Sequence, residues 1–143
     1  MRRRSVLPVL FATALLATSA ACGDNSNPTI PTPTPTPPVT QTFTGSINTN
    51  GAMTFTFDVA TSGFVTATLT SIGPDSTTLI GMSIGTYNAG VCTVGPGLNL
   101  YPAAQGASIL ASVSAPGTLC LRVFDAKGTI TTETTFSVDV AHP

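Results

Sequence analysis

The sequence predicts an all-β protein: one antiparallel β-sandwich of about seven to eight short strands, preceded by a signal peptide and a Pro/Thr-rich linker. The prediction for residues 42–143 depends on two observations. Apolar and polar residues alternate in several short segments, which is the pattern of a strand with one buried face. Residues that form tight turns separate these segments at intervals of about ten residues. No stretch of about ten residues has helical periodicity.

Each predicted strand has an aliphatic or aromatic face that we expect to point into the core. In chain order these faces are Met53, Phe55, Phe57 and Val59; Val65, Ala67 and Leu69; Ile80, Met82 and Ile84; Ile109, Ala111 and Val113; Leu119, Leu121 and Val123; and Phe136, Val138 and Val140. The turns expected between strands are 48–51, 61–63, 73–75, 95–97, 115–117 and 126–128. Each contains glycine, which adopts positive φ without strain, and three add a proline, which presets φ.

The first 21 residues have the organisation of an export signal. Three arginines are followed by an apolar run from Val6 to Phe11 and by small residues up to Ala21, the order of regions in a secretory signal peptide. Cys22 follows the expected cleavage site, and this arrangement resembles the bacterial lipoprotein box, although Ser19 stands where the box usually has leucine. The resemblance implies that Cys22 is lipidated and anchors an exported protein to a membrane of the cell envelope, facing the periplasm or the surface.

Two other interpretations of this segment stay open. A transmembrane helix needs about 20 apolar residues, but the stretch from Val6 to Ala21 is shorter and contains Pro8. Ordinary secretion also fits, because small residues at positions 19 and 21 suit a secretory cleavage site. In that case the mature protein is free outside the cell.

Removal of residues 1–21 makes the chain acidic. Three of the five basic residues leave with the signal. The remaining chain has two basic residues, Arg122 and Lys127, and six acidic ones, so its net charge is −4. A chain without a basic stripe cannot neutralise phosphates, which excludes nucleic acid as a partner. It also lacks the clustered Lys and Arg that attach proteins to anionic lipid. We therefore expect membrane contact only through the lipid anchor at Cys22.

Residues 22–41, which begin with the lipidated cysteine, are predicted to be a disordered Pro/Thr-rich linker. Proline recurs at alternate positions between 31 and 37, and such segments adopt extended polyproline II geometry. We expect a stalk that holds the following domain, residues 42–143, away from the membrane. The alternative is a peptide ligand for a polyproline-binding groove.

Cys92 and Cys120 are predicted to form a disulfide, because an even pair of cysteines remains in an exported protein once Cys22 is assigned to the anchor. Cys92 falls in a short strand between glycines 90 and 95, so the bond would tie a long connection to the sheet. A reactive thiol or a metal ligand is the alternative. Zinc needs four ligands, and the single histidine, His142, is next to the C-terminal residue, where we expect fraying. We expect no metal and no cofactor.

Four segments resemble the bacterial pre-peptidase C-terminal domain: FTGSI at 43–47, TFTFDV at 54–59, GFVTATL at 63–69 and APGTLCLRV at 115–123. The resemblance covers nearly all of residues 42–143 and implies a small β-sandwich appended to exported bacterial proteins. Some members of that family bind calcium through acidic residues in the strand after the third turn. The corresponding segment here, 77–84, has no acidic residue. Calcium also needs six to eight oxygen ligands with clustered carboxylates, so we expect no calcium site.

The sequence favours a binding or structural role over catalysis. A serine or cysteine nucleophile needs a neighbouring base, and the sequence contains neither a G-x-S-x-G motif nor a phosphate-binding loop. We therefore expect no enzymatic activity. The favoured function is a non-catalytic interaction or structural module that contacts another envelope protein or simply packs at the cell surface.

A module that binds cell-wall or extracellular glycans is the alternative function. Sugars stack on exposed aromatic rings, but the chain has no tryptophan and its phenylalanines fall mainly at core-facing positions. Tyr87 and Tyr101 are the candidates. We expect Tyr101, with Asn99 beside it in a loop at 98–102, to contact such a ligand. The competing role for Tyr101 is that of a packed loop anchor.

Overall fold

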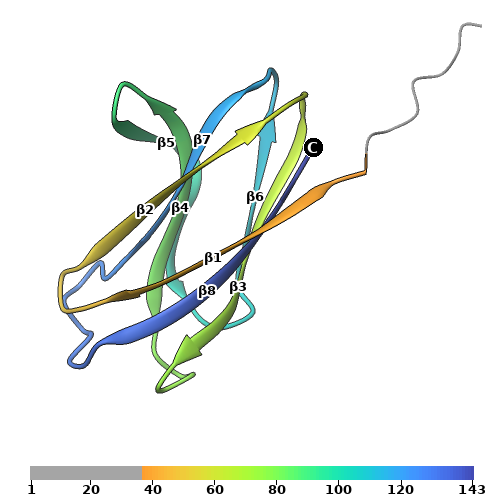
Figure 1. Ribbon diagram of the computed structural model, residues 1–143. Helices are drawn as coiled ribbons and strands as arrows, with labels where there is room; N and C mark the ends of the chain where they lie inside the picture. Colours follow the sequence, from red (N-terminus) through yellow and green to blue (C-terminus); the bar gives the residue numbers. More distant parts are fainter. Residues whose placement is uncertain (1–36) are drawn as a thin grey trace, which may run out of the picture. The chain divides into compact units, whose positions relative to one another are not determined.

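The structure, a computed structural model, describes residues 37–143, which form eight strands and no helix. The strands are β1 (Val39–Ile47), β2 (Ala52–Val59), β3 (Gly63–Gly73), β4 (Ile80–Asn88), β5 (Val91–Ala103), β6 (Ser108–Val113), β7 (Gly117–Phe124) and β8 (Thr134–His142) (Figure 1). In this part of the chain there is consequently no helix that is long and apolar enough to cross a bilayer.

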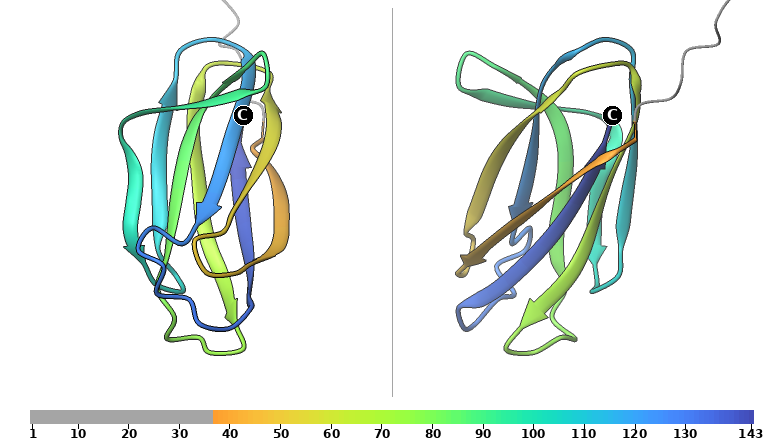
Figure 2. Two further views of the ribbon diagram at one scale, coloured as in Figure 1. Left: turned by 90° about the vertical axis from the view of Figure 1, so that its left-hand side faces the viewer. Right: turned by 45° about the vertical axis from the view of Figure 1, so that its right-hand side comes forward.

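The strands form two four-stranded antiparallel sheets. One has the order β1-β8-β3-β6 and the other the order β2-β7-β4-β5. Consecutive strands β1 and β2 belong to different sheets, as do β5 and β6, so the chain passes repeatedly from one layer to the other (Figure 2). Two antiparallel sheets packed face to face are a β-sandwich, and the predicted fold class is confirmed.

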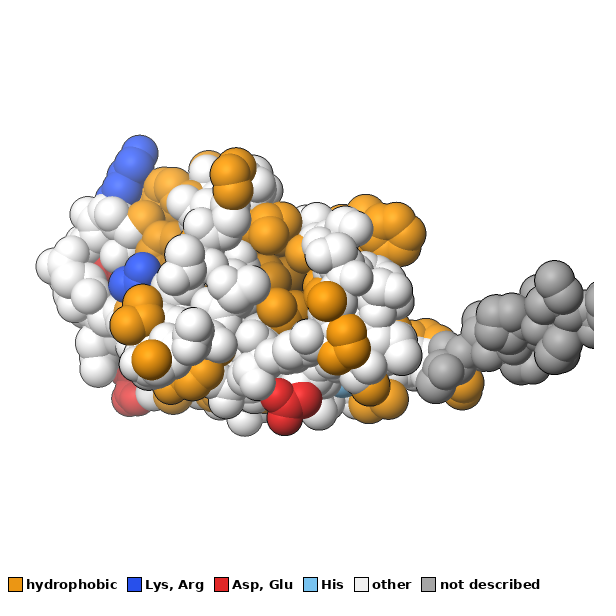
Figure 3. Space-filling view, turned by 90° about the horizontal axis from the view of Figure 1, so that it is seen from above, with side chains coloured by type: hydrophobic (Ala, Val, Ile, Leu, Met, Phe, Trp, Pro, Cys, Tyr) orange, Lys and Arg blue, Asp and Glu red, His pale blue; other side chains and the backbone are white. Residues whose placement is uncertain are grey.

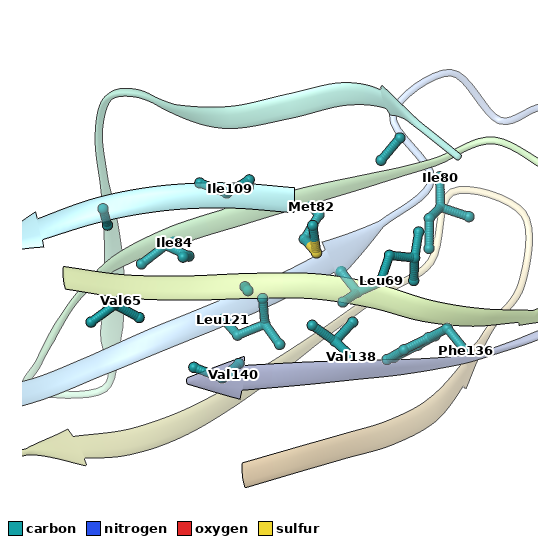
Figure 4. Packing of buried hydrophobic residues seen from close by; sticks show 14 of the residues in the cluster. Val65, Leu69, Ile80, Met82, Ile84, Ile109, Leu121, Phe136, Val138 and Val140 are labelled. Carbon is teal, nitrogen blue, oxygen red and sulfur yellow. The ribbon is translucent and has the colours of Figure 1, made fainter. Parts of the chain in front are cut away.

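The predicted apolar faces form the core between the sheets. Val65, Leu69, Leu121, Val138 and Val140 are completely buried, and Figure 4 shows them on strands of both layers. Because side chains alternate between the two faces of a strand, the apolar residues at every second position all point toward the core. Three of the expected core residues are only partly buried: Met53, Phe55 and Val113.

Strand β1 corrects the predicted boundary between linker and domain. It begins at Val39, which pairs with His142 of β8, and Gln41 pairs with Val140. The residues at 39–41 were expected in the linker, but their extended backbone continues the ladder of β8. The residues between Cys22 and β1 are therefore 23–38.

Strand β5 corrects a second expectation. The predicted turn at 95–97 and the predicted loop at 98–102 both lie within this one long strand. The pairing of β4 with β5 shifts register between Ser83 and Gly85, where Asn99 and Val94 are the respective partners. One residue of β4, Ile84, thus lies opposite four of β5, residues 95–98, and the Gly-Pro-Gly segment forms a large bulge instead of a reversal of the chain.

The expectation that His142 frays was wrong. His142 is the last residue of β8, only 4% exposed, and its ring centroid lies 5.4 Å from that of Phe57. The following residue is also held, because the carbonyl of Pro143 accepts a hydrogen bond from the amide of Ala60 at 3.4 Å. Pairing with β1 and packing on Phe57 keep this segment in the sandwich.

The connections between strands lie at two ends of the sandwich. We call the linker end the one formed by the connections at 60–62, 89–90 and 114–116, because β1 also starts there beside the end of β8. It is the upper end in Figure 1. The far end is formed by the connections at 48–51, 74–79, 104–107 and 125–133.

Candidate functional site: an apolar groove at the linker end

A groove of about 520 Å³ opens at the linker end between the two sheets. One wall is the end of the β4–β5 hairpin with the bulge of β5, and the other is the end of β6 with the connection to β7. The core side chains Ile84, Ala111 and Leu119 contribute to its floor. Figure 3 looks down on this end and shows apolar side chains at the bottom of a hollow between paler walls.

The groove exists because the tip of the β4–β5 hairpin is displaced from the plane of its sheet. At Gly85 a Cβ atom would clash with the carbonyl oxygen of Thr93, so β5 passes closer to β4 than a side chain would allow. Glycine at this position permits the close backbone approach. The displaced tip no longer covers the space beside β6.

The predicted disulfide is confirmed, and it holds the displaced hairpin. Cys92 and Cys120 are bonded, with their Cα atoms 5.8 Å apart. Cys92 belongs to β5 and Cys120 to β7, and these strands are separated in the sheet by β4. Neighbouring strands lie about 4.8 Å apart, so a bond between second neighbours requires β5 to fold over the outer face of the sheet. Cys120 is completely buried beneath it.

The lining of the groove limits its chemistry. Valines, leucines, prolines and glycines supply most of it, together with hydroxyl groups such as those of Ser112 and Thr118. No acidic, basic, histidine or aromatic side chain lines it. Such a lining offers no general base, no metal ligand and no stacking platform. It suits an apolar ligand or surface.

Asn99 and Tyr101, the predicted ligand-binding residues, lie away from this groove on β5. Asn99 is exposed and pairs with Ser83, and Tyr101 is half-buried. The ammonium group of Lys127 lies 5.4 Å from the centroid of the Tyr101 ring. This cation–π contact occupies a ring face on which a sugar would otherwise stack. The tyrosine therefore has the geometry of a packed residue at the sheet surface.

Cys22, the predicted lipidation site, lies outside the described residues, as do the predicted signal peptide and most of the predicted linker.

The acidic residues of the described chain are scattered. No group of three or more His, Cys, Asp or Glu side chains in residues 37–143 could hold a metal ion. Asp75 accepts hydrogen bonds from the amide and hydroxyl of Thr77, at 2.9 and 2.7 Å, and these bonds lower the pKa of Asp75. Asp58 accepts a hydrogen bond from the Thr118 hydroxyl at 2.6 Å. Asp75 thus stabilises its own turn, and Asp58 links β2 to its neighbour β7.

Asp125 organises the far end of the sandwich. Its carboxylate is only 7% exposed. It accepts four backbone hydrogen bonds, from the amides of Asn50 at 3.1 Å, Ile130 at 3.2 Å, Thr129 at 3.1 Å and Lys127 at 3.4 Å. Burial raises the pKa of Asp125, but these four donors outweigh it and hold the pKa below its ordinary value. Asp125 therefore joins the β1–β2 turn to the β7–β8 loop.

We expect Asp125→Asn to lower the free energy of unfolding at neutral pH by about 1–2 kcal/mol, because an amide offers one acceptor oxygen to four donors. A depressed pKa contributes stability above the unfolded-state value of about 3.9, and this contribution is lost as the pH falls through the folded-state pKa. The variant should consequently lose less stability than the parent between neutral pH and pH of about 3. Urea unfolding at both pH values measures this, with Asp58→Asn as the exposed control. An equal acid-induced loss in parent and variant would contradict the role of Asp125.

Sequence reasoning missed the groove, although one signal pointed to it. Gly81, Ser83 and Gly85 occupy alternate positions of β4 and are all buried. When a strand carries only small residues on the face that points away from the core, other segments can pack closely against that face. The ring of Phe124 covers Gly81, and β5 covers Gly85. The two glycines therefore mark the face onto which neighbouring segments fold.

Compared with known protein families and with curated proteins, the chain matches no family model and no curated protein.

Proposed function

We propose that this protein is a lipid-anchored protein of the bacterial cell envelope whose β-sandwich is a non-catalytic interaction module. The observation that carries the proposal is the placement of the three cysteines. Cys92 and Cys120 bond to each other, and the third, Cys22, directly follows a segment with the organisation of an export signal. A cysteine at that position is where a lipoprotein receives its acyl chains.

The disulfide supports export as well. Disulfides persist in oxidising compartments and are rare in the reducing cytoplasm. A bond that ties β5 to β7 across an intervening strand fixes the walls of the groove, so the groove depends on an oxidising location. Signal segment and disulfide thus support the same location independently.

The groove supports the proposal that the domain binds another molecule or surface. It is apolar, uncharged and open to solvent at one end of the sandwich. The outer edges of β5 and β6 border it, since each is the last strand of its sheet. An exposed apolar surface of this kind is typical of an interaction site.

The carbohydrate-binding alternative has less support. Asn99 and Tyr101 are on one strand at the surface, but Lys127 covers part of the Tyr101 ring, and no aromatic side chain lines the groove. A glycan would have to bind without the stacking platform that sugar-binding sites use.

Replacement of Cys22 with serine tests the anchor. We expect the parent protein to fractionate with membranes and the Cys22→Ser variant to be released into the soluble exported fraction, because several acyl chains contribute about 0.8 kcal/mol per buried CH₂. Fractionation of cells with detection by immunoblot measures this. Serine at position 26, replaced by alanine, is a matched control in the same segment and should leave the distribution unchanged. A Cys22→Ser variant that stays with membranes as fully as the parent would overturn the anchor.

A further inference from the structure

Exposed apolar side chains gather at the linker end of the sandwich. Phe64 is 68% exposed and Val91 60%, and Val39 and Val94 are also exposed at this end. Leu110, 62% exposed, extends the same surface along β6, because its partner in the ladder, Thr66, is two residues from Phe64. Among residues 37–143, one large exposed apolar side chain lies at the far end, Leu79.

Charged side chains have the opposite distribution. The connections of the far end contain four of them: Asp75, Asp125, Lys127 and Glu133. The three connections of the linker end contain none. The charged side chain closest to these connections in the sequence is Asp58 on β2, which accepts a hydrogen bond from Thr118 at one wall of the groove. The linker end is therefore both the more apolar and the less charged end of the described chain.

The chain reaches the sandwich at this same end. Residues 23–38 separate Cys22 from Val39, the first residue of β1. Even a fully extended chain of sixteen residues spans at most about 55 Å, so an anchor at Cys22 keeps the linker end within that distance of the bilayer. A tether of this length gives an effective concentration in the millimolar range, at which a weak contact is populated.

We propose that the linker end of the sandwich rests on the lipid bilayer, with Phe64, Val91 and the rim of the groove in contact with the interfacial lipid. This inference rests on the proposed lipid anchor at Cys22, and it names the bilayer as the contact of the interaction module. The sequence led us to expect membrane contact only through the anchor at Cys22, and this proposal adds a second contact, made by the domain itself. The far end, with its charged loops, faces the aqueous phase.

The arrangement of the apolar residues favours lipid over a protein partner. Phe64 and Leu110 lie on the outer face of one sheet, Val91 and Val94 on the hairpin of the other, and the groove lies between them. Fluid lipid chains can contact the exposed residues of both sheets and fill the groove between them at the same time. The described domain has three more acidic than basic side chains, so the contact does not depend on anionic lipid. We expect it to be insensitive to ionic strength.

A single introduced tryptophan tests the proposal, because the chain contains none. The full lipidated chain carrying Phe64→Trp is reconstituted into phosphatidylcholine vesicles with and without brominated acyl chains, which quench indole fluorescence on contact. We expect a blue-shifted emission and at least about twofold quenching. Leu79→Trp, at the far end, is the matched control and should be neither shifted nor quenched. A vesicle-bound Phe64→Trp chain that brominated lipid does not quench would overturn the proposal.

The same variant in a Cys22→Ser background separates the contact from the anchor. We expect this chain to bind vesicles weakly, with quenching that appears only at millimolar lipid, and Phe64→Ser to reduce the binding of the Cys22→Ser chain about tenfold. If cells do not lipidate Cys22, the anchor fails while quenching in this background still supports the contact. A blue shift that grows with protein concentration in the absence of vesicles would assign the surface to a second copy of the chain and overturn the bilayer contact.

Discussion

Replacing both Cys92 and Cys120 with alanine is expected to lower the free energy of unfolding by about 3.6 kcal/mol. The two residues are separated by 28 positions, and in the chain-entropy model a loop of that length, once closed, removes this much conformational freedom from the unfolded state. The loss is a large share of the 5–15 kcal/mol that stabilises a typical domain. Urea unfolding of the mature chain measures it, in a Cys22→Ser background so that no free thiol can exchange.

The double alanine variant has a structural consequence as well. Without the bond, the hairpin tip is no longer held against β7, and we expect amide hydrogen exchange to accelerate first in residues 86–94. Alkylation of the unreduced parent followed by mass spectrometry is the control, and neither Cys92 nor Cys120 should be modified. Two alkylated thiols, or a variant as stable as the parent, would contradict the stabilising role of the bond.

Leu121→Ala should destabilise the domain by about 3 kcal/mol. Leu121 is completely buried on β7, an inner strand of its sheet, and the core around it belongs to both layers (Figure 4). Truncation removes the transfer free energy of the deleted carbons and leaves a cavity that the surrounding strands can fill only in part. The expected result is a lower urea midpoint with an unchanged slope.

Leu110→Ala is the matched control for that change. Leu110 is a strand leucine of the same size, but it is 62% exposed on β6. We expect its replacement to change the free energy of unfolding by less than about 0.5 kcal/mol. Equal losses for the two variants would mean that burial between the sheets is not what makes Leu121 stabilising.

The alternating segments of the sequence predicted the strands well because alternation reflects a local property. A strand with one buried face must place apolar residues at every second position, and Phe136, Val138 and Val140 do so in β8. The turn at 48–51 was equally predictable. Asn50 there has a φ of 58°, a conformation that asparagine tolerates, and the amide of Gly51 bonds to the carbonyl of Asn48 at 2.7 Å.

Strand β5 was not predictable in the same way. Its Gly-Pro-Gly segment has the local chemistry of a turn, but pairing with β4 on both sides of the segment keeps the chain in the sheet as a bulge. His142 is similar, because position near the end of a chain suggests fraying, whereas pairing with Val39 and contact with Phe57 bury it. In both cases distant partners outweigh the local signal.

The sequence alone determined that this part of the chain is an all-β sandwich and identified most of the residues of its core, because burial of one strand face imposes a pattern that is visible locally. It also nominated Cys92 and Cys120 as partners, since so few cysteines are present. Only the tertiary structure decided that the bond folds β5 over its own sheet, that a groove opens beside β6, and that most of the exposed apolar residues share the end where the chain enters. These features depend on how segments far apart in the chain are placed. The small residues of β4 mark a face that is closely covered, but they do not say which segments cover it.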